Sequence, residues 1–248
     1  MKTRSLLAGI VLALCAHAAA AAEIKVLTPR AGSTLLAEIG PQFERATGNK
    51  IEVSVDLAAA LTRRVKAGEA FDLLLAAPGQ IDGLAKDGKV TSDSITNLIK
   101  SGIGVEIKAG APKPDVSTVE AFKRTLIAAR SIAYLKEGQS GLAVAKAIER
   151  IGLAATLKDK LNLPDADIVS DMVAKGEVEL GMVVVAQILT SPGVELAGPL
   201  PPELQTYITF AGAVGTQSKA PEAARDLIKF LKGPVALPVM KAQGMEPG

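Results

Sequence analysis

Residues 43–77 read FERATGNKIEVSVDLAAALTRRVKAGEAFDLLLAA, and this stretch decides the fold. A helical pattern stops at Gly48, and a strand-like run follows at Ile51–Val55. The next segment, Ala59–Ala67, has helical character, and Phe71–Ala76 is a continuously apolar strand. Strands that alternate with helices, and strands without a polar face, are typical of parallel sheets covered by helices. The stretch therefore predicts an α/β protein.

The same alternation extends in both directions along the chain. Upstream, Ile24–Thr28 is strand-like, and Ser33–Thr47 has a helical pattern that we expect Pro41 to kink or split. Downstream, the expected strands are residues 104–107, 131–134, 178–185 and 194–197, and the expected helices are residues 117–129, 142–151, 168–175, 221–231 and 234–242. The complete pattern predicts mostly parallel sheets flanked by helices.

Two Pro-rich segments, Lys108–Pro114 and Gly198–Pro202, have the composition of connectors. If the chain passes from one lobe to the other at each connector, the segment between the connectors forms a second lobe and the C-terminal part of the chain returns to the first. We expect lobe I to contain residues 23–103 and 208–248, and lobe II to contain residues 104–207. Such an arrangement creates a cleft that can close around a ligand.

The N-terminus has the pattern of a secretory signal peptide. Lys2 and Arg4 precede the apolar run Leu6–Leu14, and small residues lead to an expected cleavage site between Ala22 and Glu23. We therefore interpret residues 1–22 as a signal peptide and expect a periplasmic protein. No apolar stretch reaches the length of a transmembrane helix, so we expect no insertion into the membrane.

Removal of residues 1–22 changes the composition in ways that restrict the chemistry. Without Lys2 and Arg4, the 28 Lys and Arg residues become 26 and balance the 26 Asp and Glu residues. This balance, without a basic cluster, argues against nucleic-acid binding. The single Cys and the single His also lie in residues 1–22. Thiol and imidazole catalysis, disulfides and the usual zinc sites are therefore excluded, and we expect neither a metal nor a cofactor.

Several short motifs resemble a known family. They are FERATGNKIEV at 43–53, KAGEAFDLLLAA at 66–77, KGEVELG at 175–181, VELAGPLPPEL at 194–204, PEAAR at 221–225 and GMEP at 244–247. In their order and spacing, they resemble the periplasmic solute-binding proteins of the molybdate-binding (type II) family. The resemblance implies a two-lobed fold with the ligand cleft between the lobes, a small anion as ligand, a membrane transporter as partner, and a monomer.

The resemblance ends at the expected ligand positions. Members of that family hold a tetrahedral oxyanion with serine hydroxyls and backbone amides after the first two strands, and with a tyrosine from a later strand. The corresponding positions in this sequence are Ala31, Ala58 and Val184, which carry no hydroxyl. Each lost hydrogen-bond partner in a dry pocket costs about 1–3 kcal/mol. The substitutions therefore favour an organic carboxylate or polycarboxylate over molybdate.

Two turns of lobe I are candidates for ligand contact. Arg30 precedes Gly32 and Ser33 after the first strand, and its guanidinium can bind a carboxylate through two hydrogen bonds. Alternatively, Ser33 only caps a helix and Arg30 is solvated. In the second turn, Asp56 is a general base or a helix cap. At most one of the adjacent Arg63 and Arg64 that follow it can face the cleft, and we take Arg63 as the candidate.

The turn before the helix at Leu142 is the corresponding candidate in lobe II. Gln139, Ser140 and Gly141 offer backbone amides and a hydroxyl to an anion, although ordinary helix capping explains them equally. Tyr134 and Glu137, with Lys136, lie just before this turn and can supply a proton-transferring group. Surface exposure is the commoner fate of such charged residues.

Two functions fit these observations. The first is periplasmic binding of a small anion by closure of the two lobes, with an organic carboxylate favoured over molybdate. The alternative is a periplasmic isomerase that interconverts cis- and trans-aconitate by an allylic proton shift, because such isomerases are similar to the molybdate-binding family. This reaction needs no metal, and its base is Asp56, Tyr134, Lys136 or Glu137. Asp165, Asp167 and Asp171 lack the spacing of a calcium loop, and we interpret them as a solvated acidic segment.

Overall fold

The structure is a computed structural model that describes residues 21–248. The expected signal peptide therefore lies outside the described residues, except for its last two positions. In the first part of the chain, the strands β1, β2 and β3 pair in parallel, with β1 in the middle. Their bounds are Glu23–Thr28, Lys50–Val55 and Leu73–Ala76, and the helices that alternate with them are α1 (Arg30–Thr47), α2 (Ala58–Lys66) and α3 (Pro78–Lys86).

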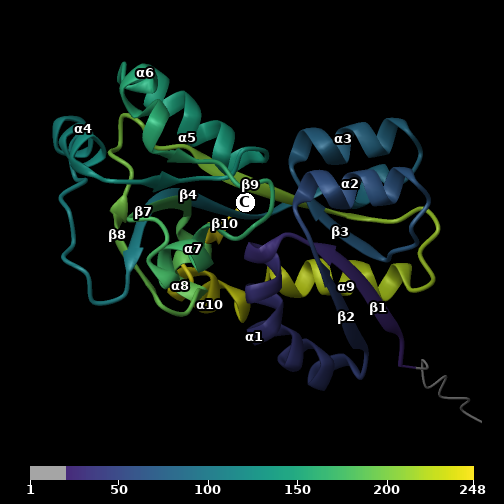
Figure 1. Ribbon diagram of the computed structural model, residues 1–248. Coiled ribbons are helices and arrows are strands. Elements are labelled where there is room, and N and C mark those ends of the chain that lie inside the picture. Colours follow the sequence, from purple (N-terminus) through teal and green to yellow (C-terminus); the bar gives the residue numbers. More distant parts are fainter. Residues whose placement is uncertain (1–20) are drawn as a thin grey trace, which may run out of the picture.

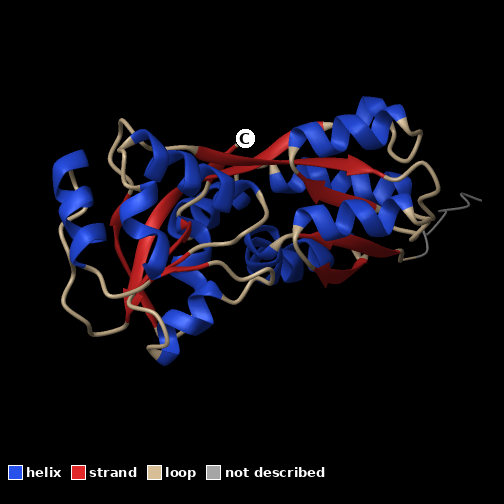
Figure 2. Ribbon diagram, turned by 45° about the horizontal axis from the view of Figure 1, so that its top comes forward, coloured by secondary structure: helices blue, strands red, loops and turns tan. Residues whose placement is uncertain are grey.

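The second part of the chain forms another parallel group, in which β5 lies between β6 and β7. Their bounds are Ile132–Ala133 for β5, Leu161–Asn162 for β6 and Leu180–Val184 for β7. The helices of this part are α4 (Val119–Ala128), α5 (Gln139–Arg150), α6 (Ala154–Leu157), α7 (Val169–Lys175) and α8 (Val185–Thr190). Figures 1 and 2 show the two groups of strands side by side, each covered by helices.

Two long strands, β4 (Thr96–Lys108) and β9 (Tyr207–Val214), join the two groups. The order of strands is β2-β1-β3-β9-β4-β7-β5-β6, and β9 and β4 run antiparallel to the strands beside them. β4 changes partners along its length, because residues 96–102 pair with β9 and residues 103–108 pair with β7 and with β8 (Val194–Pro199). The chain closes with α9 (Pro221–Leu231), α10 (Ala236–Ala242) and β10 (Glu246–Pro247), which pairs with β4. This two-lobed α/β architecture confirms the fold class.

Helix α1 differs from the sequence expectation, because it continues through Pro41 without a break in the assigned helix. A proline removes one amide donor and leaves the carbonyl four residues earlier, here that of Ala37, without its helical partner. Ala37 is exposed, so water can bind this carbonyl. The buried face of α1, which includes Leu35, Ile39 and Phe43, holds the helix against the sheet.

Sequence patterns missed α3, α6, β6, α8, β9 and β10. Helix α3 begins with Pro78-Gly79, a pair that reads as a turn in the sequence although proline suits the first position of a helix. Strand β9 contains three consecutive small residues, Ala211, Gly212 and Ala213, that weaken its strand pattern. Gly212 is required there, because a Cβ atom would press against the side chain of Leu98 on β4. None of the helices in residues 21–248 combines the length and apolar character of a membrane span.

A buried carboxylate, Asp72, ties the C-terminal part of the chain to the strands of the first group. Its Oδ2 accepts a hydrogen bond from the backbone N–H of Lys25 (2.8 Å). Its Oδ1 accepts hydrogen bonds from the Ser218 hydroxyl (2.7 Å) and from the backbone N–H groups of Lys219 (2.9 Å) and Ala220 (3.1 Å). Burial acts to raise the pKa of Asp72, but these four donors outweigh it and hold the pKa below its usual value.

Candidate functional site

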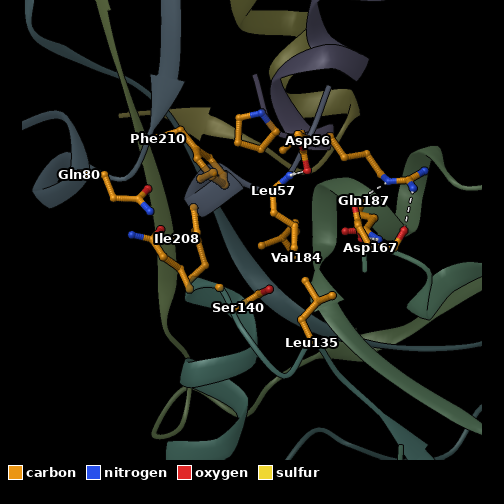
Figure 3. A pocket seen from close by; sticks show the side chains of 17 residues that line it. Asp56, Leu57, Gln80, Leu135, Ser140, Asp167, Val184, Gln187, Ile208 and Phe210 are labelled. Carbon is orange, nitrogen blue, oxygen red and sulfur yellow. Dashed lines mark hydrogen bonds and ion pairs between the residues drawn. The ribbon is translucent and has the colours of Figure 1, made fainter. Parts of the chain in front are cut away.

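A pocket lies between the two groups of strands and is lined from both sides (Figure 3). The first group contributes Pro29, Arg30, Ala31, Asp56, Leu57, Ala58, Ala59 and Gln80, and the second contributes Leu135, Gly138, Gln139, Ser140, Asp167, Val184 and Gln187. Ile208 and Phe210 of β9 complete the lining. The pocket therefore brings together residues that follow the carboxyl ends of several strands, which is where open α/β sheets bind ligands.

Three of the longer helices begin at this pocket without a capping side chain. The residues before their first turns are Pro29 for α1, Leu57 for α2 and Gly138 for α5, and none of them makes a side-chain capping bond. By contrast, Thr118 caps α4 away from the pocket by accepting a hydrogen bond from the N–H of Ala121 (3.1 Å). The first N–H groups of a helix lack intrahelical partners and carry partial positive charge. Three uncapped helix starts at one pocket make an environment suited to an anion.

Two glycines allow these helices to begin so close to the strands. A Cβ atom on Gly32 would collide with the Thr28 hydroxyl at the end of β1, and one on Gly141 would collide with the carbonyl oxygen of Leu135. Both residues were expected to contact the ligand, but neither lines the pocket. Their position near the helix starts instead permits the close packing that aims the first turns of α1 and α5 at the pocket.

Arg30 reaches across the pocket and is already paired with a carboxylate of the protein. Its Nε donates a hydrogen bond to Asp167 Oδ2 (2.9 Å), and its Nη2 donates one to the backbone oxygen of Asp167 (3.0 Å). Gln187 Nε2 donates to the other carboxylate oxygen, Oδ1, of Asp167 (2.9 Å). The interpretation of Asp167 as a solvated surface residue is therefore wrong, because it lines the pocket and links the two sides of the cleft.

Behind Asp167 lies a buried carboxyl group, Glu106, near the C-terminal end of β4. Its side chain is fully buried, and Ser170 Oγ donates to Oε2 (2.9 Å) and approaches Oε1 (3.2 Å). Gln187 Nε2 lies 3.3 Å from the same hydroxyl, so a continuous chain of hydrogen bonds joins Glu106 to Asp167 and Arg30. Burial raises the pKa of Glu106 to about 7, with a smaller opposing effect of the Ser170 hydrogen bond and a further increase from the Asp167 charge.

Asp56 is the other carboxylate of the pocket lining. Its Oδ1 accepts a hydrogen bond from the N–H of Leu57 (2.8 Å), and its Oδ2 lies 3.5 Å from an Arg64 nitrogen. The side chain of Asp56 is 40% exposed. One carboxylate oxygen is thus held by the backbone, and the other is only loosely paired and accessible from the pocket.

The three positions that carry no hydroxyl, Ala31, Ala58 and Val184, all line the pocket. Among the lining residues, Ser140 is the one that carries a hydroxyl group, and Arg30 is the one cation. Gln139 also lines the pocket, and its side-chain oxygen is buried without a hydrogen-bond partner among the described residues.

Four further sequence candidates lie outside the lining. Ser33 donates its hydroxyl hydrogen bond to the backbone oxygen of Arg30 (2.8 Å) instead of facing the pocket. Arg63 is exposed, because α2 buries Leu61 and Val65, and position 63 falls on the opposite side of the helix.

Tyr134 and Glu137 are the other two candidates that do not line the pocket. Tyr134 is buried in the hydrophobic core, and burial followed by the charge of Glu149 raises its pKa. Its neighbour Leu135 lines the pocket instead, because successive residues of an extended segment point to opposite sides. Glu137 is exposed, as is Lys136, which pairs with Asp165 (3.3 Å).

Sequence patterns did not identify Gln80, Gln187, Asp167, Ile208 or Phe210 as pocket residues. One sequence feature could have identified Gln80, namely its position three residues after Ala77, the residue that precedes α3. In the structure, the backbone N–H of Ala77 donates a hydrogen bond to the side-chain oxygen of Gln80 (3.2 Å). Such a glutamine marks the beginning of a helix at the end of a strand.

The chain is similar to known proteins over most of its length. The model of the family described as bacterial extracellular solute-binding protein matches residues 24–246. An aconitate isomerase from a Pseudomonas species is 32% identical over 85% of this chain and 82% of its own length. A molybdate-binding protein from Azotobacter vinelandii is 30% identical over 93% of this chain and 92% of its own length.

Solved structures share the same fold. A periplasmic molybdate-binding protein of Azotobacter vinelandii superimposes with a TM-score of 0.77 at 20% identity, covering 91% of this chain and 99% of that one. The substrate-binding domain of a putative molybdenum transporter from Clostridium difficile gives a TM-score of 0.70 at 20% identity, covering 92% of this chain and 100% of that one. These structures are two-lobed binding proteins, in agreement with the fold described above.

Proposed function

This chain belongs to the bacterial extracellular solute-binding protein family, and we propose that it binds a small organic polycarboxylate in the cleft between its lobes. Closure would bring residues 104–207 against residues 23–103 with 208–248. We further propose that the protein acts in the periplasm after cleavage of residues 1–22, and that it delivers its ligand to a membrane transporter.

The observation that carries this proposal is the composition of the pocket. Three uncapped helix starts and Arg30 offer hydrogen-bond donors to an anion, whereas Ala31, Ala58 and Val184 offer no hydroxyl. The planar guanidinium of Arg30 matches a carboxylate. The apolar side chains of the lining can pack against the carbon skeleton of an organic anion, which molybdate lacks. These side chains are Leu57, Leu135, Val184, Ile208 and Phe210.

The test is titration calorimetry of the chain from Glu23 onward with cis-aconitate, trans-aconitate and molybdate. We expect binding of an aconitate and none of molybdate. Arg30→Gln should weaken binding by about tenfold or more, since the lost charge-assisted hydrogen bonds contribute about 1.5–3 kcal/mol. Arg63→Gln is the matched control, because it removes the same charge from an exposed position outside the lining. Tight molybdate binding, or equal losses in both variants, would contradict the proposal.

The second candidate function is an aconitate isomerase. The 32% identity to a protein of that name favours it, as does the presence of a loosely paired carboxylate, Asp56, in the lining. In such a reaction, Asp56 Oδ2 would remove a proton from the methylene carbon of cis-aconitate. The double bond would shift, and the same carboxyl would return the proton to the other end of the allylic system. Arg30 and the helix N–H groups would stabilise the negative charge that develops on the substrate carboxylates.

Proton NMR of the same protein with cis-aconitate distinguishes a receptor from an enzyme. Turnover would produce trans-aconitate, and Asp56→Asn should lower the rate by at least about 100-fold, as expected for loss of a general base. Glu137→Gln is the control, because Glu137 is an exposed carboxylate outside the lining. Binding without conversion would leave the receptor function and exclude the isomerase.

A further inference from the structure

Glu106 is an ionisable residue in the interior of the molecule, on the long strand β4 that joins the two groups of strands. It is fully buried, and the hydrogen bonds of its carboxyl group within residues 21–248 are those with Ser170. The space around it is filled, because a Cβ atom on Gly181 of β7 would collide with Glu106 Oε1. A buried carboxylate with one hydroxyl donor is poorly compensated, so its neutral form is favoured by its surroundings.

The charged groups around Glu106 come from few elements. Asp167 and Asp171 lie before and within α7, and Arg30 opens α1. The other neighbours carry no charge: Gly181 of β7 and Leu196 of β8 pair with it, and Gln187 of α8 contacts its Ser170 partner. Arg30 is therefore the one cation that can offset both Glu106 and Asp167 in this network.

In this arrangement, the protonation state of Glu106 sets the net charge of the groups beside the pocket. With Glu106 ionised, Arg30, Asp167 and Glu106 together carry one net negative charge. With Glu106 protonated, the same three groups are neutral, and Arg30 is opposed by Asp167 alone. An incoming carboxylate would meet repulsion in the first state and a neutral surface in the second. Because Glu106, Ser170 and Gln187 are buried and link Glu106 to the half-buried Asp167–Arg30 pair by hydrogen bonds, water screens this difference only in part.

We propose that Glu106 is a proton-linked positioning residue: when protonated, it lets the Asp167–Arg30 network accept a carboxylate ligand, and when ionised, it excludes one. This inference rests on the proposed function for the identity of the ligand, but not for the proton linkage itself. It implies that the protein takes up a proton as it binds its anion near neutral pH and releases both together at higher pH.

The ligand-dependent test is calorimetry with cis-aconitate at pH 6.0–8.5 in pairs of buffers that differ in ionisation enthalpy. The parent protein should take up about half a proton near pH 7 and close to one proton at pH 8 and above, where its affinity should fall by up to about tenfold per pH unit. Glu106→Gln should show neither effect, whereas Glu177→Gln, which removes an exposed carboxylate outside this network, should behave like the parent. The ligand titrates identically with every variant, so a slope shared by the parent and Glu106→Gln would overturn the proposal.

A ligand-free test separates failure of this inference from failure of the proposed function. In ¹⁵N-labelled protein, the Nε–H signal of Arg30 reports its hydrogen bond to Asp167. The signal should titrate between pH 6 and 8 in the parent and not in Glu106→Gln. If no aconitate binds but this difference is present, the polycarboxylate assignment fails and the proton linkage stands. If the signal is unchanged by pH, or titrates equally in both proteins, the proton linkage is wrong. Ser170→Ala is a second variant. It removes the hydroxyl that links Glu106 to Gln187 and keeps the Glu106 carboxyl, so it should alter the titration of the Arg30 signal.

Discussion

Two buried carboxyl groups, Asp72 and Glu106, show how differently the two parts of the molecule treat the same chemical group. Asp72 is 6% exposed and receives hydrogen bonds from three backbone N–H groups and one hydroxyl. Glu106 is 0% exposed, and its side chain is hydrogen-bonded to Ser170. The pKa of Asp72 is lowered, whereas that of Glu106 is raised to about 7. Burial alone does not decide the charge state; the number of donors does.

The difference corresponds to position in the fold. Asp72 joins the turn before α9 to the strands of the first group, where its charge is fixed and its role is structural. Glu106 lies at the end of a hydrogen-bonded chain that reaches the pocket. A carboxylate with four donors stabilises the fold over a wide pH range, whereas a carboxyl with one donor can change its protonation near neutral pH.

The largest expected effect is that of Asp72→Ala. It would remove the acceptor of the part-buried N–H groups of Lys25 and Lys219 and one of the two acceptors of the Ala220 N–H, so we expect a loss of about 3–5 kcal/mol in the free energy of unfolding. Urea unfolding at pH 7 measures this loss. Asp93→Ala, which breaks an exposed ion pair with Arg225, is the control and should cost about 0–1 kcal/mol. A loss below about 1 kcal/mol for Asp72→Ala would contradict the structural role that we assign to Asp72.

The pH dependence of stability gives the next largest effect. The folded-state pKa of Glu106, about 7, lies above its unfolded value of 4.5. Between these values the folded protein holds a proton that the unfolded chain has lost, so stability must decrease as pH rises through this window. A shift of this size corresponds to about 3 kcal/mol.

Glu106→Gln isolates this contribution, because glutamine keeps the shape and does not titrate. The variant should gain stability relative to the parent as pH increases from 5 to 8, as measured by urea unfolding at each pH. For Asp72 the sign is opposite: its stabilisation is lost as pH falls through its lowered pKa. Parallel stability curves for the parent and Glu106→Gln would show that Glu106 does not titrate in this range.

A smaller effect is expected from filling the space beside Glu106. Gly181→Ala would place a methyl group against the carboxylate and against Val173, at a cost of about 1–3 kcal/mol. Gly83→Ala in α3 is the matched control, because a Cβ atom there meets no neighbour and alanine favours a helix, so it should stabilise the protein by up to about 1 kcal/mol. If Gly181→Ala also stabilises the protein, the surroundings of Glu106 are looser than the structure indicates. Thermal unfolding distinguishes the two outcomes.

The smallest effects compare the two serine partners. Ser218→Ala removes one of four donors from Asp72, and we expect a loss of about 1 kcal/mol with the pKa of Asp72 still below its usual value. Ser170→Ala removes the side-chain donor of Glu106, so the pKa of Glu106 should rise further and the pH-dependent loss of stability should extend to higher pH. Equal pH profiles for the two variants would contradict the distinction between the carboxylates.

Much of the fold was predictable because its signals are local. The apolar strand at 71–76 and the stop at Gly48 appear in the structure as β3 and as the end of α1, where Gly48 has a φ of 77°. The position of Ala31, Ala58 and Val184 at the pocket was also expected, since the ends of parallel strands meet at one edge of a sheet. By contrast, β9 and α3 were missed, because small residues and a Pro-Gly pair hide their patterns.

The sequence by itself therefore determined the alternation of strands and helices, the balance of charges and the lack of thiol and imidazole groups after residue 22. Only the tertiary structure decided that Arg30 pairs with Asp167, which lies 137 residues away, and that Tyr134 is buried whereas Leu135 faces the pocket. It also decided the state of Glu106, whose surroundings come from α1, α7, β7, β8 and α8. Periodicity reports which face of an element is buried, but the charge of a buried group depends on donors and charges that distant segments bring to it.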